Sequence, residues 1–172
     1  VTGSGKSEVY LRRAEDVIRS GKQVLYMVPE ITLSHQVTGE VYQRFNKRVA
    51  ILHSALTPSQ RLKVWREIMN GDVDLVVGAR SSVFAPFKNL GLIVMDEEHE
   101  GAYKSGQSPR YSARQVAQYR AGKWKAQLIM GSATPSLEAW NLIRTQKIKS
   151  VVMRNRIGEA KFPKISIVNM RG

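Results

Sequence analysis

The chain has 172 residues, 42% of them hydrophobic and 24% charged, which is enough for one domain with a sizeable core. It contains no cysteine, so disulfides and cysteine-ligated zinc are excluded within these residues. Its 27 Lys and Arg against 14 Asp and Glu leave a net charge of +13, which favours a polyanionic partner, although a basic, well-solvated surface would have the same composition.

Short apolar runs alternate with longer amphipathic stretches along the chain. In chain order we expect helix 7–20, strand 24–28, helix 33–46, strand 49–52, helix 59–70, strand 75–77, strand 92–95, helix 113–121, strand 128–130 and helix 137–146. The strands are short, unalternating and rich in β-branched residues, as expected for strands covered on both faces. Thr57 and Pro58 can begin the third helix, Gly71 can end it, and Gly21 can end the first. The pattern predicts an α/β fold, a parallel sheet with helices on both faces.

The segment TGSGKS at the amino end matches most of the phosphate-loop pattern G-x-x-x-x-G-K-[ST]. In such a loop, backbone N–H groups bind the phosphates, the lysine adds a positive charge, and the hydroxyl holds Mg²⁺. The alternative is a Gly/Ser turn before a helix. The first glycine of the pattern would precede Val1, so we expect a P-loop NTPase fold that lacks the strand before the loop. The candidate ATP-binding residues are Thr2, Gly3, Ser4, Gly5, Lys6 and Ser7, with Lys6 catalytic and Ser7 on the metal.

The apolar run 92–95 leads directly into Asp96, Glu97, Glu98 and His99. A carboxylate at the end of a strand can hold Mg²⁺, and its neighbour can activate the attacking water, so Asp96 is assigned to the metal and Glu97 to the catalytic base. A solvated acidic turn is the alternative. Ligands of parallel sheets bind beyond the carboxyl ends of the strands. We therefore predict that the amino-terminal lysine and this acidic cluster converge on one magnesium–triphosphate.

Residues 100–114 combine two tyrosines with three cations among small polar residues. Aromatic rings can stack on unpaired bases while cations contact phosphates, and this segment follows the acidic cluster, so DNA contact there could move Glu97 and His99. The alternative is that both tyrosines pack against the body of the domain. The candidate DNA-binding residues in this segment are Tyr103, Lys104, Arg110, Tyr111 and Arg114.

Further candidate DNA contacts follow two other strands. Arg80, Ser81 and Ser82 could donate hydrogen bonds to phosphates, or the serines could cap a helix. Thr32 and Gln36 lie on one face at the start of a helix and could contact the sugar–phosphate backbone, or form a simple capping pattern.

Several of these motifs resemble those of a known family. DEEH at 96–99 and GSATPS at 131–136, each after a strand, resemble motifs II and III of superfamily 2 helicases, and VPEITLSHQ at 28–36 looks like motif Ia. GARSSVFAPF at 78–87 looks like the following DNA-contacting motif. The combination is most similar to the primosomal protein N′ family of bacterial replication-restart helicases, over essentially the whole chain.

The resemblance implies a RecA-like motor domain of a cytoplasmic, bacterial, ATP- and Mg²⁺-dependent helicase that moves 3′ to 5′ on single-stranded or forked DNA. His99, Ser132 and Thr134 would couple hydrolysis to movement, although Ser132 and Thr134 could as easily cap the helix that follows. Residues 1–150 would be the first motor domain, truncated at its start, and 151–172 its edge and exit towards a second.

Partners implied by the resemblance are other primosome proteins and single-strand-binding protein. Zinc is expected only in a part outside this chain, and no membrane contact is expected. Two alternatives remain: another superfamily 2 DNA translocase, such as a restriction-enzyme motor subunit, or, for these residues alone, a non-catalytic DNA-binding module.

Overall fold

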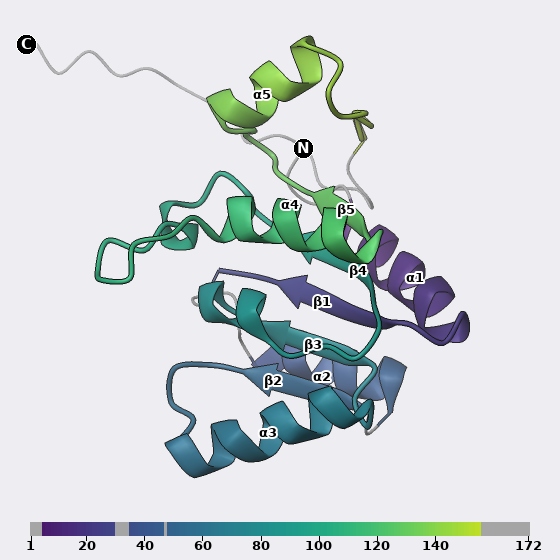
Figure 1. The fold of residues 1–172 in the computed structure, drawn as a ribbon. Coiled ribbons are helices and arrows are strands. Elements are labelled where there is room, and N and C mark those ends of the chain that lie inside the picture. The colour runs from purple at the N-terminus through teal and green to yellow at the C-terminus, as the bar shows by residue number, and fades with distance from the viewer. Residues whose placement is uncertain (1–4, 30–34, 47, 156–172) are drawn as a thin grey trace, which may run out of the picture.

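Five parallel strands form one sheet in the order β2-β3-β1-β4-β5, so their carboxyl ends share one edge (Figure 1). The computed structural model describes residues 5–29, 35–46 and 48–155, and for residues 35–37 it describes only the backbone. The helices and strands in chain order are α1 (Lys6–Arg19), β1 (Gln23–Met27), α2 (His35–Phe45), β2 (Val49–Leu52), α3 (Pro58–Asn70), β3 (Leu75–Gly78), β4 (Leu90–Met95), α4 (Ala113–Trp124), β5 (Gln127–Met130) and α5 (Leu137–Arg144).

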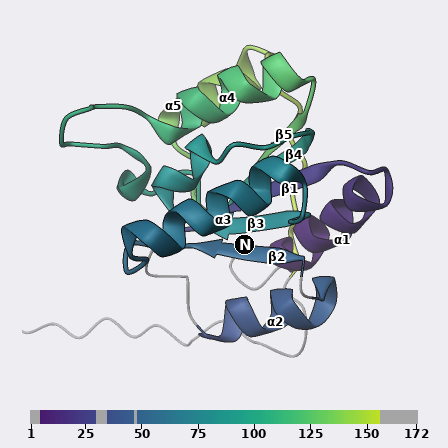
Figure 2. The ribbon, with the colours of Figure 1, turned by 60° about the horizontal axis from the view of Figure 1, so that its bottom comes forward.

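Helices cover both faces of the sheet, as the pattern predicts. Along β1, Val24 and Tyr26 pack with core residues of α1 and α2, whereas Leu25 and Met27 pack with core residues of α3 and α4. Figure 2 shows α2 and α4 on opposite sides of the sheet. The strands β1, β3 and β4 are buried along their whole length, which explains their unalternating apolar sequences. The α/β fold with a parallel sheet is confirmed.

The ends of α3 follow the signals in the sequence. The Thr57 hydroxyl accepts a hydrogen bond from the Gln60 N–H, and the Gln60 side chain accepts one from the Thr57 N–H, which makes a capping box ahead of Pro58. Gly71 ends the helix with a φ of 86°, a left-handed conformation that glycine adopts without a steric penalty. All the expected helices and strands are present, and their ends differ from the expected ones by a turn or less.

Within the described residues, β5 forms an edge of the sheet and pairs only with β4. Its residues are exposed or half-buried, whereas those of the other strands are buried apart from Ile51 of β2. Beyond it lies α5, which exposes Leu137 and Trp140 (Figure 1). Residues 156–172 lie outside the described part of the chain, so the domain boundary expected at residue 150 stays a prediction. Across residues 5–29, 35–46 and 48–155, no helix has the length and apolar character needed to cross a bilayer.

Two short 3₁₀ helices among the described residues are not predicted from the sequence. They are η2 (Arg80–Phe84), which follows β3, and η3 (Gly101–Tyr103), which follows the acidic cluster at the end of β4. Both follow the carboxyl ends of strands and carry candidate DNA-binding residues.

The buried side-chain amide of Gln23 connects four segments at the amino ends of the strands. The Gln23 side-chain nitrogen donates to the carbonyls of Ile68 (3.0 Å) and Val73 (2.7 Å). Its oxygen accepts from the backbone N–H groups of Lys88 (2.8 Å) and Asn89 (3.0 Å). All four hydrogen-bonding positions of the side chain are therefore used inside the core.

Replacing Gln23 with Leu should lower the free energy of unfolding by about 2–4 kcal/mol, because the shape is roughly kept while two buried carbonyls and two part-buried N–H groups lose a partner. Urea unfolding followed by circular dichroism measures this. Gln115, which is exposed on α4, provides the matched control: Gln115→Leu should change stability by less than about 0.5 kcal/mol. Equal effects of the two substitutions would contradict the role assigned to Gln23.

Candidate nucleotide site and nucleic-acid interface

The lysine of the phosphate loop contacts the acidic end of β4. Helix α1 begins at Lys6, after Gly5 in a left-handed conformation with φ of 80° and no side-chain cap. Lys6 Nζ donates to Glu97 Oε1 at 3.1 Å, between groups 91 residues apart in the chain. The predicted convergence of the lysine and the acidic cluster is therefore observed. Thr2, Gly3 and Ser4 lie outside the described residues.

Asp96 is half-buried next to two core tyrosines. The hydroxyl groups of Tyr10 and Tyr26 lie near its side chain, and the Ser7 side chain lies near Tyr26. Burial, and next the negative charge of Glu97, raise the pKa of Asp96 above its ordinary value. The two predicted metal ligands, Ser7 and Asp96, thus share Tyr26 as a neighbour.

Few protein groups gather where a divalent ion would bind. In the described part of the chain there is no group of three His, Cys, Asp or Glu side chains that could hold a metal ion. One carboxylate and one hydroxyl fit Mg²⁺, which is usually held by one or two protein oxygens together with substrate phosphates and water. The donor set therefore fits a magnesium–nucleotide complex better than a structural metal site.

Gly131, which follows β5, allows Tyr10 to reach Asp96. A Cβ atom at residue 131 would lie 1.6 Å from the Tyr10 hydroxyl oxygen and 3.4 Å from Asp96 Oδ1. Burial, and next the charge of Asp96, raise the pKa of Tyr10 above its ordinary value. The glycine that opens the GSATPS segment is therefore required by close packing at the site.

Glu97 has an unusual backbone conformation, with φ of 47°. In the described residues, the three other non-glycine residues with positive φ (Asn46, Lys125 and Gln146) follow helix ends, where this conformation is common. At Glu97 it turns the chain sharply after β4, and the Glu97 N–H is held by Asp96 Oδ1 at 3.0 Å.

The predicted coupling residues form a chain of polar contacts. His99 Nδ1 lies 3.5 Å from Glu97 Oε2 and 2.6 Å from Ser132 Oγ. Ser132 Oγ in turn accepts from the Thr134 N–H at 3.0 Å. These contacts link the end of β4 to the segment after β5. Ser132 and Thr134 do not cap α5, which was the alternative to their coupling role: the cap is Ser136, whose Oγ accepts from the Ala139 N–H.

The third carboxylate, Glu98, has no role predicted from the sequence, yet it is the most buried acidic group at the site, with 2% of its side chain exposed. Its oxygens accept from the Ser136 N–H at 2.7 Å and the Ser136 hydroxyl at 2.9 Å. Arg114 lies 3.4 Å from Glu98 and donates to Ser136 Oγ at 3.0 Å. The position of Glu98 directly after a buried strand could have indicated a functional or buried carboxylate. Its partners could not be found from the sequence, because Arg114 and Ser136 are 16 and 38 residues away.

Arg114 was predicted to contact DNA, but its placement favours a structural role. Only 16% of its side chain is exposed, and its guanidinium also pairs with Glu138 at 3.7 Å. Tyr103 differs from the prediction in the same way: it is 3% exposed, and its hydroxyl donates to the Asp96 carbonyl at 2.7 Å. This placement favours the alternative in which Tyr103 packs against the domain.

The other candidates in this segment lie at the surface. Tyr111 is half-buried against Phe84, with ring centroids 4.9 Å apart, and the Arg80 guanidinium lies 5.8 Å from the Tyr111 ring centre. Arg110 is exposed, and exposed Lys104 pairs with Glu138 at 3.6 Å.

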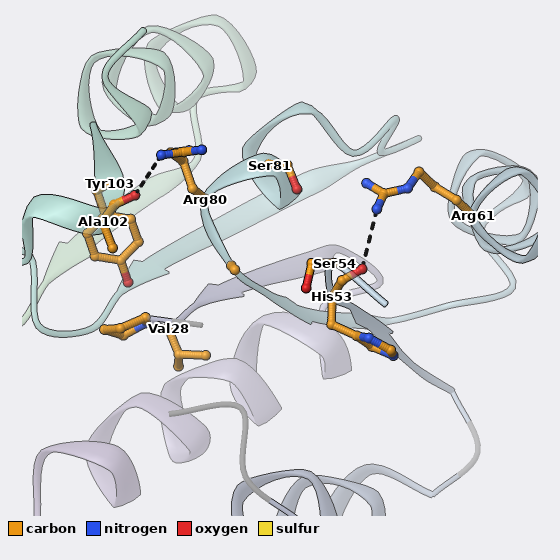
Figure 3. Close-up of a pocket in the computed structure, with 10 residues that line it drawn as sticks. Val28, His53, Ser54, Arg61, Arg80, Ser81, Ala102 and Tyr103 are labelled. Carbon is orange, nitrogen blue, oxygen red and sulfur yellow. Dashed lines mark hydrogen bonds between the residues drawn. The ribbon is translucent and has the colours of Figure 1, made fainter. Parts of the chain in front are cut away.

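A pocket of about 340 Å³ lies at the carboxyl ends of β1, β2 and β3 (Figure 3). Arg80 and exposed Ser81 line it, as does Arg61 of α3, which donates to the His53 carbonyl. The remaining lining residues are Val28, Pro29, His53, Ser54, Ala79, Ala102 and Tyr103. Guanidinium and hydroxyl groups give it the character of an anion site.

Three other predicted contacts are less accessible or lie outside the description. Ser82 is 1% exposed, and its hydroxyl donates to the Ala79 carbonyl at 2.6 Å; it does not cap η2, which begins after Ala79 without a side-chain cap. Thr32 and the side chain of Gln36 lie outside the described residues, so their DNA contacts stay predictions.

A parallel sheet with a lysine-bearing loop and an acidic cluster at its carboxyl edge is the arrangement of a RecA-like α/β domain. The family model described as "DEAD/DEAH box helicase" matches residues 1–142. The chain belongs to this family.

The chain is also similar to proteins named "Replication restart protein PriA". It is 51% identical over 170 residues to that of Treponema pallidum and 43% identical over 171 residues to that of Bacillus subtilis, in each case over 99% of this chain. It spans only 26% and 21% of those proteins, about a quarter or less of their length. These relatives confirm the resemblance to replication-restart helicases.

Solved structures show the same fold. RecG bound to a three-way DNA junction is 30% identical, with a TM-score of 0.56, over 81% of this chain and 18% of that chain. The helicase MrfA bound to DNA is 17% identical, with a TM-score of 0.53, over 82% of this chain and 20% of that chain, and supports the fold alone.

Two arginines of the same segment should respond differently to replacement. Arg114→Met leaves the buried Glu98 carboxylate without its cation and should lower the free energy of unfolding by about 2–4 kcal/mol. Arg110→Met, at an exposed position, should change it by less than about 0.5 kcal/mol. Urea unfolding of the two variants compares them directly, and a more destabilising Arg110→Met would contradict the assignment of Arg114 to the interior network.

Proposed function

We propose that this chain is the first motor domain of an ATP-dependent DNA helicase of the replication-restart type. The observation that carries the proposal is the contact between Lys6 and Glu97 at 3.1 Å, because it joins a phosphate-binding lysine to a carboxylate suited to activate water. Membership of the DEAD/DEAH box family supports ATP use in general, and similarity to PriA proteins supports the biological role.

The nucleotide would bind at the amino end of α1. The first backbone N–H groups of a helix point outward and carry partial positive charge, and Gly5 has no side chain to cap them. Lys6 would bind the β- and γ-phosphates, while Ser7 and Asp96 would hold Mg²⁺, which supplies charge neutralisation to the transferred phosphoryl group. A triphosphate would compete with Glu97 for the Lys6 ammonium, and Glu97 would then be available to orient and deprotonate water.

Hydrolysis would be reported to the rest of the domain through His99. Its ring lies between Glu97 and Ser132, so a displacement of the catalytic carboxylate changes a hydrogen bond to the segment that leads into α5. Glu98, Arg114 and Ser136 brace the same two segments from the interior. The coupling role of His99, Ser132 and Thr134 rests on this continuity.

Single-stranded DNA would cross the carboxyl ends of β1, β2 and β3, with a phosphate in the pocket of Figure 3. Arg80 and Ser81 were predicted as contacts there, and the structure adds Arg61 to them. The excess of 13 positive charges and the similarity to RecG, whose structure holds a three-way DNA junction, both support DNA as the polyanion. Movement from 3′ to 5′, primosome partners, single-strand-binding protein and zinc elsewhere in the protein are proposed by resemblance alone.

A second candidate is a DNA-binding module without catalytic activity. The exposed outer edge of β5 favours it for these residues alone, since an incompletely covered sheet is expected to be a weak frame for the nucleotide site. The isolated chain should then hydrolyse ATP poorly while still binding single strands in a salt-dependent way. Another superfamily 2 translocase is a third reading, against which the similarity to PriA proteins argues.

The proposal is tested by DNA-stimulated ATP hydrolysis in the full-length protein. Glu97→Gln should reduce the turnover rate by about 100-fold or more with ATP affinity largely kept, because general-base catalysis contributes about that much. Lys6→Ala should weaken nucleotide binding as well as turnover. Lys123→Ala, an exposed cation in the last turn of α4, is the control and should match the wild type. Undiminished unwinding by either site variant would refute the motor assignment.

A further inference from the structure

An exposed phenylalanine follows closely in the chain after Arg80 and Ser81, which line the pocket. Phe84, in the 3₁₀ helix η2, is 45% exposed, whereas its neighbours Ser82 and Val83 are 1% and 0% exposed. A 3₁₀ helix has three residues per turn, so residues 81 and 84 lie on the same face, about 6 Å apart along the axis. One face of η2 therefore presents the Ser81 hydroxyl, which lines the pocket, and next to it an aromatic ring.

The ring of Phe84 is supported by other groups rather than loose. It packs edge to face with Tyr111, at 4.9 Å between centroids and 69° between planes, and the Arg80 guanidinium lies 5.8 Å from the Tyr111 centre. Arg80 is itself fixed by hydrogen bonds to the carbonyls of Ala102 (3.3 Å) and Lys104 (2.9 Å). Two aromatic rings and a cation thus form a fixed surface between η2 and the 102–111 segment.

The backbone of η2 around Phe84 is held by hydrogen bonds from α4. The half-buried Arg120 of α4 donates to the carbonyls of Val83 and, at 2.8 Å, Ala85, on either side of Phe84 in the chain. The same guanidinium lies 5.4 Å from the Phe87 ring centre. An exposed apolar side chain on so firmly held a backbone loses little entropy when a flat ligand covers it.

We propose that Phe84 is a stacking site for an unpaired nucleobase of single-stranded DNA whose phosphate enters the adjoining pocket. The inference rests on the proposed function and makes it more specific. A nucleotide strand is the occupant that fits, because it offers flat aromatic rings and phosphates side by side. The surface around Phe84 is cationic, with Arg80 and Arg61 in the pocket and exposed Lys104 and Arg110 in the neighbouring segment.

This assignment differs from the one that the sequence suggests. Tyr103 is buried with its hydroxyl on the Asp96 carbonyl, and the Tyr111 ring is flanked by Phe84 and Arg80. Phe84 is the more exposed partner of the ring pair, so it offers the surface on which a base can stack. Tyr111 then supports Phe84 from the side rather than stacking on the base itself.

The test compares two oligonucleotides of equal length and charge, an oligothymidylate and the same backbone without bases, in fluorescence-anisotropy titrations of the full-length protein. Phe84→Ala should weaken oligothymidylate binding about 5- to 100-fold and should change binding of the abasic strand less than twofold. Phe84→Leu keeps an apolar side chain on η2 but has no aromatic face, and should show the same selective loss. Tyr119→Ala removes an aromatic side chain that is 71% exposed on α4 and should have no effect on either strand.

The outcomes separate the inference from the function on which it rests. The inference is overturned if both Phe84 variants lose the same affinity for the oligothymidylate and for the abasic strand. It is also overturned if neither variant loses affinity for either strand, because Phe84 then does not stack on a base. If wild-type protein binds neither strand, the proposed DNA-binding function itself fails. Thermal melting of each variant shows whether the compared proteins are folded. If Phe84→Ala has a lowered melting temperature, the test rests on Phe84→Leu.

Discussion

The contact between Lys6 and Glu97 exists because the amino end of α1 lies at the edge where the parallel strands have their carboxyl ends. A parallel sheet gathers the carboxyl ends of all its strands along one edge, so groups 91 residues apart in sequence become neighbours without any long excursion of the chain. The order β2-β3-β1-β4-β5 puts the acidic end of β4 between β1 and β5. Whatever binds at that edge therefore contacts segments from both halves of the chain at once.

Two layers of polar contacts connect the end of β4 to the segment after β5. The outer layer runs from Glu97 through His99 to Ser132 and is partly open to solvent, so its hydrogen bonds can be exchanged at modest cost. The inner layer, Glu98 with Arg114 and Ser136, is largely shielded and hard to break without leaving a charge unpaired. The first layer can therefore rearrange at little cost, while the second keeps the two segments in place.

Local patterns were sufficient for most of the fold and for part of the site. Apolar runs without alternation revealed the buried strands, and Thr57, Pro58 and Gly71 marked the ends of α3 because caps depend on neighbouring residues only. Tyr103 and Arg114 could not be placed this way, since a polar loop sequence does not reveal which of its side chains fold back on the domain. The roles of Gln23 and Arg120 could not be predicted either, because their partners are backbone carbonyls and amides of distant segments. The residue types in a sequence do not indicate such backbone partners.

The left-handed backbone at Glu97 sets stability and chemistry against each other at a single position. A side chain in that conformation costs about 1–2 kcal/mol that glycine would not incur. Glycine at this position would remove that cost, but it would also remove the carboxylate that contacts Lys6 and His99.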